Sequence, residues 1–269
     1  QAKVPPPSAH GTWPTREHDR TVLLLAGCVQ PSMLPNINYA TARVLDAVGI
    51  QTVIADKAGC CGAVKFHLND QDRALAQMRA NIDAWWPAVE SGQAEAIVTN
   101  ASGCGAMVKD YAHALRHDSA YAAKAQRVSA LARDLSELLP ALLPELADKL
   151  AGRAKLPQQP MAYHPPCTLQ HAQKLQGVVE ANLGKLGFQL RTARTESHLC
   201  CGSAGTYAVL QPGISTTLRN RKLSALEEAF DGGAPAAILS ANVGCITHLQ
   251  AGTPVPVRHW VEVLDEALA

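Results

Sequence analysis

"AGCCGAVKF" at residues 58–66 and "HLCCGSAGT" at residues 198–206 each contain two adjacent cysteines followed at once by glycine. The chain has eight cysteines in two sets with matching spacing. The first cysteine quartet is Cys28, Cys60, Cys61 and Cys104, and the second cysteine quartet is Cys167, Cys200, Cys201 and Cys245. Each member of the first quartet lies 139 to 141 residues before its counterpart. The chain is therefore an internal duplication.

Other segments obey the same shift. "AIVTNASGC" at residues 96–104 aligns with "AILSANVGC" at residues 237–245. A repeat of this length far exceeds the roughly 20–50 residues of solenoid units, so two similar half-domains are expected. We place them at residues 21–150 and 151–269. Residues 1–20, with three consecutive prolines among polar residues, are expected to form a linker.

Short apolar runs alternate with helix-like stretches in both halves. The expected strands are residues 21–28, 51–56, 95–100, 160–164, 188–193, 236–241 and 255–260. The expected helices are residues 38–49, 72–86, 120–143, 171–186 and 213–230, with a closing helix after residue 260. Prolines at 144, 157 and 160 are expected to break regular structure between the halves. This alternation predicts an α/β protein with two Rossmann-like half-domains and mostly parallel sheets.

In this layout, each cysteine position follows the end of an expected strand. Open parallel sheets form their ligand crevices at the carboxyl ends of the strands. We therefore expect the four thiols of each half to converge at one sheet edge.

Three kinds of site could use such a quartet. A disulfide between adjacent cysteines closes a strained ring, which disfavours that reading. Zinc accepts four thiolates, but structural zinc sites usually take them from C-x₂₋₄-C loops, which neither half contains; zinc in one half stays an alternative. An iron–sulfur cluster can collect thiolates from separate loops. All eight cysteines are therefore candidate cluster ligands.

Gly62 and Gly202 follow the paired cysteines and are candidate cofactor-contacting residues. Without side chains they let the backbone approach a cluster and leave N–H groups free for its sulfides. His67, His164 and His198 are near the cysteines in sequence and could bond to a cluster or replace a thiolate; a packing or capping role is the alternative. Arg258, His259 and Trp260 could face a partner.

The composition is that of an ordinary globular protein, with 47% hydrophobic and 17% charged residues and a net charge of +1. Such a balanced charge gives no support for nucleic-acid binding. No apolar run approaches the roughly 18 residues of a membrane span, and no signal peptide is recognisable, so a cytoplasmic location is expected. Neither a Ser-His-Asp set nor a phosphate loop stands out. We expect no catalytic residue on this chain.

The pattern C-x₃₁-CCG-x₄₁-C, repeated as C-x₃₂-CCG-x₄₂-C, resembles the cysteine-rich CCG domain. That domain occurs in the catalytic subunit of heterodisulfide reductase and in iron–sulfur subunits of respiratory dehydrogenases. "AGCVQPSMLPNINYATARVLDAVGI", "AGCCGAVKFHLN", "NIDAWWPAVESG" and "ASGCGAMVKDY" are similar to segments of glycolate oxidase iron–sulfur subunits. The resemblance covers residues 20–269.

This resemblance implies an electron-transfer subunit of a glycolate oxidase (dehydrogenase) complex. Flavoprotein partner subunits would oxidise glycolate to glyoxylate on FAD, and this chain would pass the electrons toward a quinone-type acceptor, with peripheral association at the inner face of the membrane through the complex. Full-length members carry an amino-terminal ferredoxin-like region with two further clusters, which is expected to precede residue 1.

One feature departs from the heterodisulfide reductase pattern. There each half closes with C-x-x-C and uses five cysteines for a double cluster, whereas Ala101 and Asn242 stand at the corresponding positions here. Four cysteines per half imply a single cluster of the [4Fe–4S] type. Two other functions stay open: a thiol–disulfide reductase of the heterodisulfide reductase type, and a metal-free docking scaffold for the flavoprotein subunits.

Overall fold

The computed structural model describes residues 10–151, 156–231 and 233–269. The chain divides into two compact units, of which one ends at Leu138 and the other begins at Leu139. The three consecutive prolines of the expected linker lie outside the described residues. Among the described residues, no helix has both the length and the apolar character needed to cross a bilayer.

The first unit is built on a four-stranded parallel sheet. Its strands are β1 (Arg20–Leu24), β2 (Ile50–Val53), β3 (Ala94–Thr99) and β4 (Ala132–Asp134), in the order β2-β1-β3-β4. The central strand β1 is buried from Val22 to Leu24, as expected for a parallel strand covered on both faces. Its register pairs Arg20 with Ile50 and Leu23 with Ile97.

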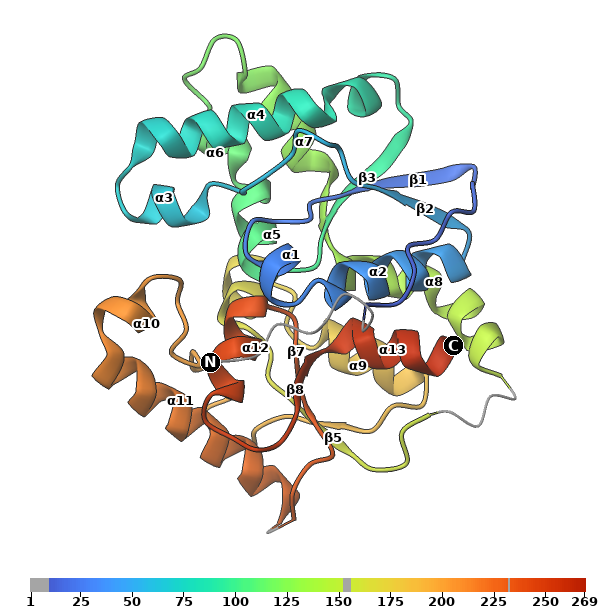
Figure 1. Ribbon diagram of the computed structural model, residues 1–269, viewed down its shortest axis with the longest axis vertical. Helices are drawn as coiled ribbons and strands as arrows, with labels where there is room; N and C mark the ends of the chain where they lie inside the picture. Colours follow the sequence, from blue (N-terminus) through green and yellow to red (C-terminus); the bar gives the residue numbers. More distant parts are fainter. Residues whose placement is uncertain (1–9, 152–155, 232) are drawn as a thin grey trace. The chain divides into compact units, whose positions relative to one another are not determined.

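Helices cover both faces of this sheet. They are α1 (Gln30–Met33), α2 (Asn36–Ala47), α3 (Ala63–His67), α4 (Gln71–Glu90), α5 (Ser102–Lys109), α6 (Tyr111–Ala114) and α7 (Ala122–Leu131). Figure 1 shows α4 and α7 on one side of β1–β3 and α2 on the other. Met78, Ile82 and Trp85 recur at helical spacing along α4 and pack against the strand residues Leu23 and Ile97, which fixes α4 on the sheet.

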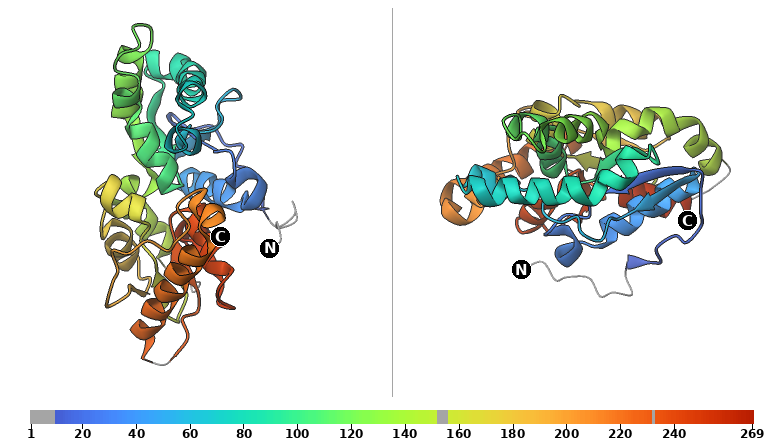
Figure 2. Two further views of the ribbon diagram at one scale, coloured as in Figure 1. Left: turned by 90° about the vertical axis from the view of Figure 1, so that its left-hand side faces the viewer. Right: turned by 90° about the horizontal axis from the view of Figure 1, so that it is seen from above.

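The second unit repeats this plan. Its strands are β5 (Met161–Tyr163), β6 (Leu190–Arg191), β7 (Ile238–Ser240) and β8 (Val257–His259), all parallel, in the order β6-β5-β7-β8. Its helical elements are a π-helical turn (Thr168–Ala172), α9 (Val178–Lys185), α10 (Tyr207–Leu210), α11 (Pro212–Glu227), a 3₁₀ turn (Glu228–Phe230), α12 (Val243–Gln250) and α13 (Trp260–Leu268). In Figure 2, α4 (cyan) and α11 (orange) are the long helices of their units.

Equivalent backbone bonds confirm the duplication. Leu25 N–H donates to the Val98 carbonyl at 3.0 Å, and His164 N–H donates to the Leu239 carbonyl at 2.8 Å. The two sheets also share one strand order when their strands are numbered within each unit. The predicted fold class, two similar α/β half-domains with parallel sheets, is confirmed.

The single helix predicted over residues 120–143 is wrong. Ala132–Asp134 interrupt it as β4, which pairs with β3 and leaves α7 before it and α8 (Leu135–Leu150) after it. The Asp134 carboxylate accepts a hydrogen bond from the Ser136 N–H at 3.0 Å and so restarts the helix.

Pro144 does not break the helix as expected. It lies inside α8, where it is exposed, while Leu139, Leu142 and Leu146 are buried. The burial of these leucines offsets the backbone bond that proline removes. The helix expected at 171–186 starts only at Val178, because Gly177 in the left-handed conformation separates it from the π-helical turn.

Candidate metal centre

The first cysteine quartet comes from three loops at the carboxyl edge of the first sheet. Cys28 follows β1, Cys60 and Cys61 follow β2, and Cys104 is in the first turn of α5 after β3. The parallel strands β1, β2 and β3 are neighbours, so their ends bring these loops together. The Cys28 and Cys60 sulfurs lie 3.4 Å apart. All eight cysteines of the chain are free thiols.

Hydrogen bonds run along the first quartet in sequence order. Donation from Cys28 and then from Cys61 lowers the pKa of the Cys60 thiol to about 2. The Cys61 thiol is also within hydrogen-bond reach of Cys104 and lowers the pKa of Cys104. The pKa values of the donating thiols are raised instead. The bond to Cys60 raises the pKa of Cys28, and the bond to Cys104 raises that of Cys61. In the first quartet, the pKa values of Cys60 and Cys104 are thus shifted toward the thiolate, the form that binds metals.

The second cysteine quartet repeats this arrangement. Cys167 follows β5, Cys200 and Cys201 precede α10, and Cys245 is in the first turn of α12 after β7. Donation from Cys167 and then Cys201 lowers the pKa of Cys200 to about 2. Donation from Cys201, together with a contact from His164, lowers the pKa of Cys245 to about 6 against the effect of burial. The structure thus gathers four thiols in each half.

Gly62 and Gly202 take the same strained conformation, with φ of 91° in each. A Cβ on Gly62 would be 3.1 Å from the Ala74 carbonyl oxygen, and a Cβ on Gly202 would be 2.4 Å from the Ser215 carbonyl oxygen. Both carbonyls belong to the long helix of their unit, so glycine lets this helix pack against the cysteine turn. The Gly202 N–H donates to the Cys200 sulfur at 3.3 Å.

Asn81 and Tyr111 fix the paired cysteines of the first half. The Asn81 side chain accepts from the Gly59 N–H at 2.7 Å and donates to the Cys60 carbonyl at 2.8 Å. The Tyr111 hydroxyl donates to the Cys61 carbonyl at 2.9 Å. Both side chains are buried. Asn81 has one signal in the sequence, since it is a polar residue on the otherwise apolar face of α4.

Lys222 takes over this task in the second half, and it too was missed. Its ammonium group donates to the carbonyls of Glu196 at 2.6 Å and Ser197 at 3.4 Å, in the segment leading to Cys200. Burial lowers the pKa of Lys222, and the nearby Cys201 and Glu196 side chains act in the opposite direction. Lysines in helices usually lie on the exposed face, so the sequence does not indicate that Lys222 is buried beside the cysteines.

The three candidate histidines separate in the structure. His164 is fully buried and lies with Cys201 and Cys245 in a group whose possible ligand atoms are all within 4.8 Å of one another. His67 and His198 have exposed side chains. The expectation that Arg258, His259 and Trp260 face a partner is wrong for the last two, since both are buried and His259 caps α13.

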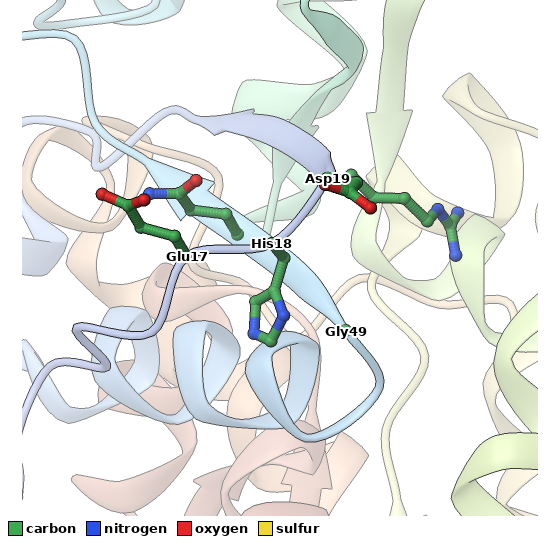
Figure 3. A pocket seen from close by; sticks show the side chains of 6 residues that line it. Glu17, His18, Asp19 and Gly49 are labelled. Carbon is green, nitrogen blue, oxygen red and sulfur yellow. The ribbon is translucent and has the colours of Figure 1, made fainter.

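The hollow drawn in Figure 3 lies away from the cysteines. Its volume is about 520 Å³, and Glu17, His18, Asp19 and Gly49 line it at the amino-terminal ends of β1 and β2. The thiols follow the opposite ends of these strands. This hollow is therefore not part of the cysteine site.

The donor set fits a metal cofactor that prefers sulfur. Each half offers four thiols, the pKa values of two of them are lowered, and backbone N–H groups donate to the sulfurs. Thiolate ligands select zinc, copper(I) and iron–sulfur clusters over hard cations such as magnesium. The second half has no fifth cysteine at the position where the heterodisulfide reductase pattern has one. Asn242 stands there and caps α12, where its side chain accepts from the Gly244 N–H.

Comparison with known proteins supports the same division of the chain. The family model described as the cysteine-rich domain, CCG, matches residues 22–109 and again residues 161–250. The glycolate oxidase iron-sulfur subunit of Escherichia coli (strain K12) is 54% identical over 255 residues, which cover 95% of this chain and 60% of that protein.

Two more distant relatives differ in length. The probable glycolate oxidase iron-sulfur subunit of Bacillus subtilis (strain 168) is 26% identical, over 87% of this chain and 50% of that protein. Lactate utilization protein A of Geobacillus thermodenitrificans is 28% identical, over 91% of this chain and 98% of that protein. The chain thus spans about half to 60% of the two glycolate oxidase subunits.

Proposed function

The chain belongs to the cysteine-rich CCG domain family, and on this premise we propose that it is an iron–sulfur electron-transfer portion of a glycolate oxidase complex. The convergence of four free thiols in each half carries the proposal. The 54% identity to a glycolate oxidase iron-sulfur subunit supports the choice of complex.

Cys28, Cys60, Cys61 and Cys104 would hold one cluster, and Cys167, Cys200, Cys201 and Cys245 the other. A bound [4Fe–4S] cluster supplies one-electron transfer. The polypeptide supplies thiolates in fixed positions, and Asn81, Tyr111 and Lys222 hold the loops that present the paired cysteines. The N–H groups of Gly62 and Gly202 complete the polar surroundings of the sulfurs.

Substrate oxidation is assigned to flavoprotein partners rather than to this chain. Two hollows among the described residues, one lined by residues between Glu17 and Gln51 and the other near Ser224–Pro235, have no cysteine in their lining. We propose that FAD on these partners oxidises glycolate and that electrons leave toward a quinone-type acceptor at the membrane. A ferredoxin-like region, as implied by the family resemblance, would extend the relay.

A zinc ion in the second quartet is the alternative metal. His164 beside Cys201 and Cys245 gives a mixed histidine and cysteine donor set, which zinc also accepts. Metal analysis separates the two. Iron with acid-labile sulfide supports the proposed relay, and zinc in place of iron contradicts it for that half.

Electron transfer from a partner tests the function itself. The chain, purified without oxygen, is mixed with flavoprotein subunits of glycolate oxidase that glycolate has reduced. We expect the visible absorbance of the clusters to bleach at a rate that rises with flavoprotein concentration. No bleaching in an iron-containing protein would contradict the relay.

The same preparation decides between the two other functions. Oxidation of a reduced cluster signal that depends on an added disulfide would favour the thiol–disulfide reductase. Near-zero iron together with tight binding of the flavoproteins would favour the scaffold.

A further inference from the structure

The two halves place different residues behind their cysteine quartets. His164 occupies the position of Leu25, because its backbone N–H makes the same bond to the neighbouring central strand: His164 to Leu239 and Leu25 to Val98. An apolar side chain in the first half is thus replaced by an imidazole in the second.

A second replacement lies on the long helices. The carbonyls that crowd Gly62 and Gly202 are those of Ala74 and Ser215, which are 141 residues apart. The same shift places Lys222 over Asn81. Both side chains are buried, and each bonds to the backbone just before or at the paired cysteines. A neutral amide in the first half is thus replaced by a buried ammonium group.

His164 directs a hydrogen-bond donor at the second quartet. Its side chain has no exposed surface, and its ring interacts with the Cys245 thiol, lowering the pKa of that thiol. An imidazole always carries at least one N–H. The sulfurs of Cys201 and Cys245 lie within 4.8 Å of the ring nitrogen that groups with them, which makes sulfur the available acceptor.

Lys222 places a positive charge close to the same sulfurs. Only 3% of the residue is exposed, and its charge acts on Cys201, Cys200 and Cys167. The first half has a lysine near Cys60 as well, but 34% of the Lys65 side chain is exposed and it lies 3.7 Å from the Asp70 carboxylate. Water therefore screens Lys65 more than the buried Lys222, and the carboxylate that acts on Lys222, that of Glu196, is itself paired with Arg221.

We propose that His164 and Lys222 give the second quartet a higher reduction potential than the first, so that the second half is the electron-accepting end of the pair. This inference rests on the proposed function, because it requires a cluster in each half. Reduction adds one negative charge, and a nearby cation or an N–H donor to sulfur stabilises the reduced form more than the oxidised form.

Burial acts in the opposite direction. Cys245 is buried where Cys104 is half-buried, and Cys167 is less exposed than Cys28. A drier site disfavours added negative charge, which alone would lower its potential. The same low polarity strengthens the attraction to Lys222, which is itself inside the site. A buried cation therefore outweighs the modest difference in exposure.

Potentiometric EPR titration of the protein purified without oxygen tests this proposal. The signals are assigned by recording Cys201→Ser, which removes the second site. In the wild-type protein we expect the second site to be reduced at the higher potential. Lys222→Gln keeps a donor for the Glu196 carbonyl but removes the charge, and His164→Leu installs the residue of the first half.

Each variant is expected to lower the ratio of reduced to oxidised second site about tenfold at a fixed potential, equivalent to about 59 mV for a one-electron couple. The first site should be unchanged. The matched control Lys65→Gln, at a half-buried lysine beside the Asp70 carboxylate, should change the ratio at the first site less than twofold.

The possible outcomes distinguish this inference from the proposed function on which it rests. A protein without iron would contradict both. Two clusters with equal potentials, a lower potential in the second half, or unshifted variants would overturn the inference and leave the relay intact. Loss of second-site iron in His164→Leu would make His164 a ligand and overturn its assignment as a donor.

Discussion

Gly202 shows how one residue joins a cysteine turn to a helix. Its backbone is left-handed, and the Ser215 carbonyl lies where a side chain would begin. Gly177 offers a matched control, because its φ is 77° and no atom lies within 4 Å of a Cβ placed there.

We expect Gly177→Ala to lower the free energy of unfolding by about 1–2 kcal/mol, the cost of a left-handed alanine. Gly202→Ala should cost about 2–5 kcal/mol, because steric overlap with Ser215 adds to the backbone term. Urea unfolding measures both. Equal losses in the two variants would show that helix packing does not require Gly202.

The paired cysteines carry the second residue-scale prediction. Cys61 and Cys201 each lie within hydrogen-bond reach of two neighbouring thiols, so each sits in the middle of its quartet. We expect Cys61→Ser or Cys201→Ser to remove the iron of its own half only, so that about half of the iron per chain is lost. The ligands were misassigned if Cys61→Ser, Cys201→Ser double-variant protein keeps its full iron content.

The cysteines could be placed from the sequence because their spacing repeats and strand ends are easily recognised. His164 was a candidate for the same reason, since it precedes Cys167 closely. Lys222 and Asn81 could not be found this way. Their side chains reach the site because of how α11 and α4 are rotated about their own axes. Tertiary contacts determine this rotation.

At the scale of elements, a short strand followed by a capped helix occurs in each unit. "ARDLSELL" at residues 132–139 and "VRHWVEVL" at residues 257–264 share Arg, Glu and Leu at the same places. The Glu137 carboxylate accepts from the Asp134 N–H, and Glu262 accepts from the His259 N–H, both at 2.7 Å. These are capping boxes of one design.

This likeness could have revealed β4, which the sequence analysis missed. The two segments are 125 residues apart rather than about 140, because α6 and α7 lengthen the first half before β4. A search at one fixed shift therefore passes over them. The helical leucine spacing on either side of residue 132 then favours one continuous helix.

The capping box of α13 gives an element-scale prediction. Glu262→Ala removes the acceptor for the His259 N–H and is expected to lower the free energy of unfolding by about 0.3–1.5 kcal/mol. Glu262→Gln should retain most of this stability, because glutamine also serves in a capping box. Thermal or urea unfolding of the three proteins measures the difference. Equal losses in both variants would argue that the ion pair with Arg258, and not the cap, is what matters.

At the scale of the whole molecule, duplication supplies two cysteine quartets with the same candidate ligands and different surroundings. Each unit keeps the strand order, the glycine turn and the sulfur chain, while Leu25 and Asn81 correspond to His164 and Lys222. A difference in potential between two carriers favours net electron transfer toward the carrier with the higher potential. The duplication thus repeats the fold, while the residues around each cysteine quartet differ.

The number of iron and inorganic sulfide atoms per chain, measured on protein purified without oxygen, tests the central claim most directly. Two [4Fe–4S] clusters predict about eight of each. Four or fewer iron atoms per chain in such a preparation, or zinc in place of iron, would contradict a cluster in each half.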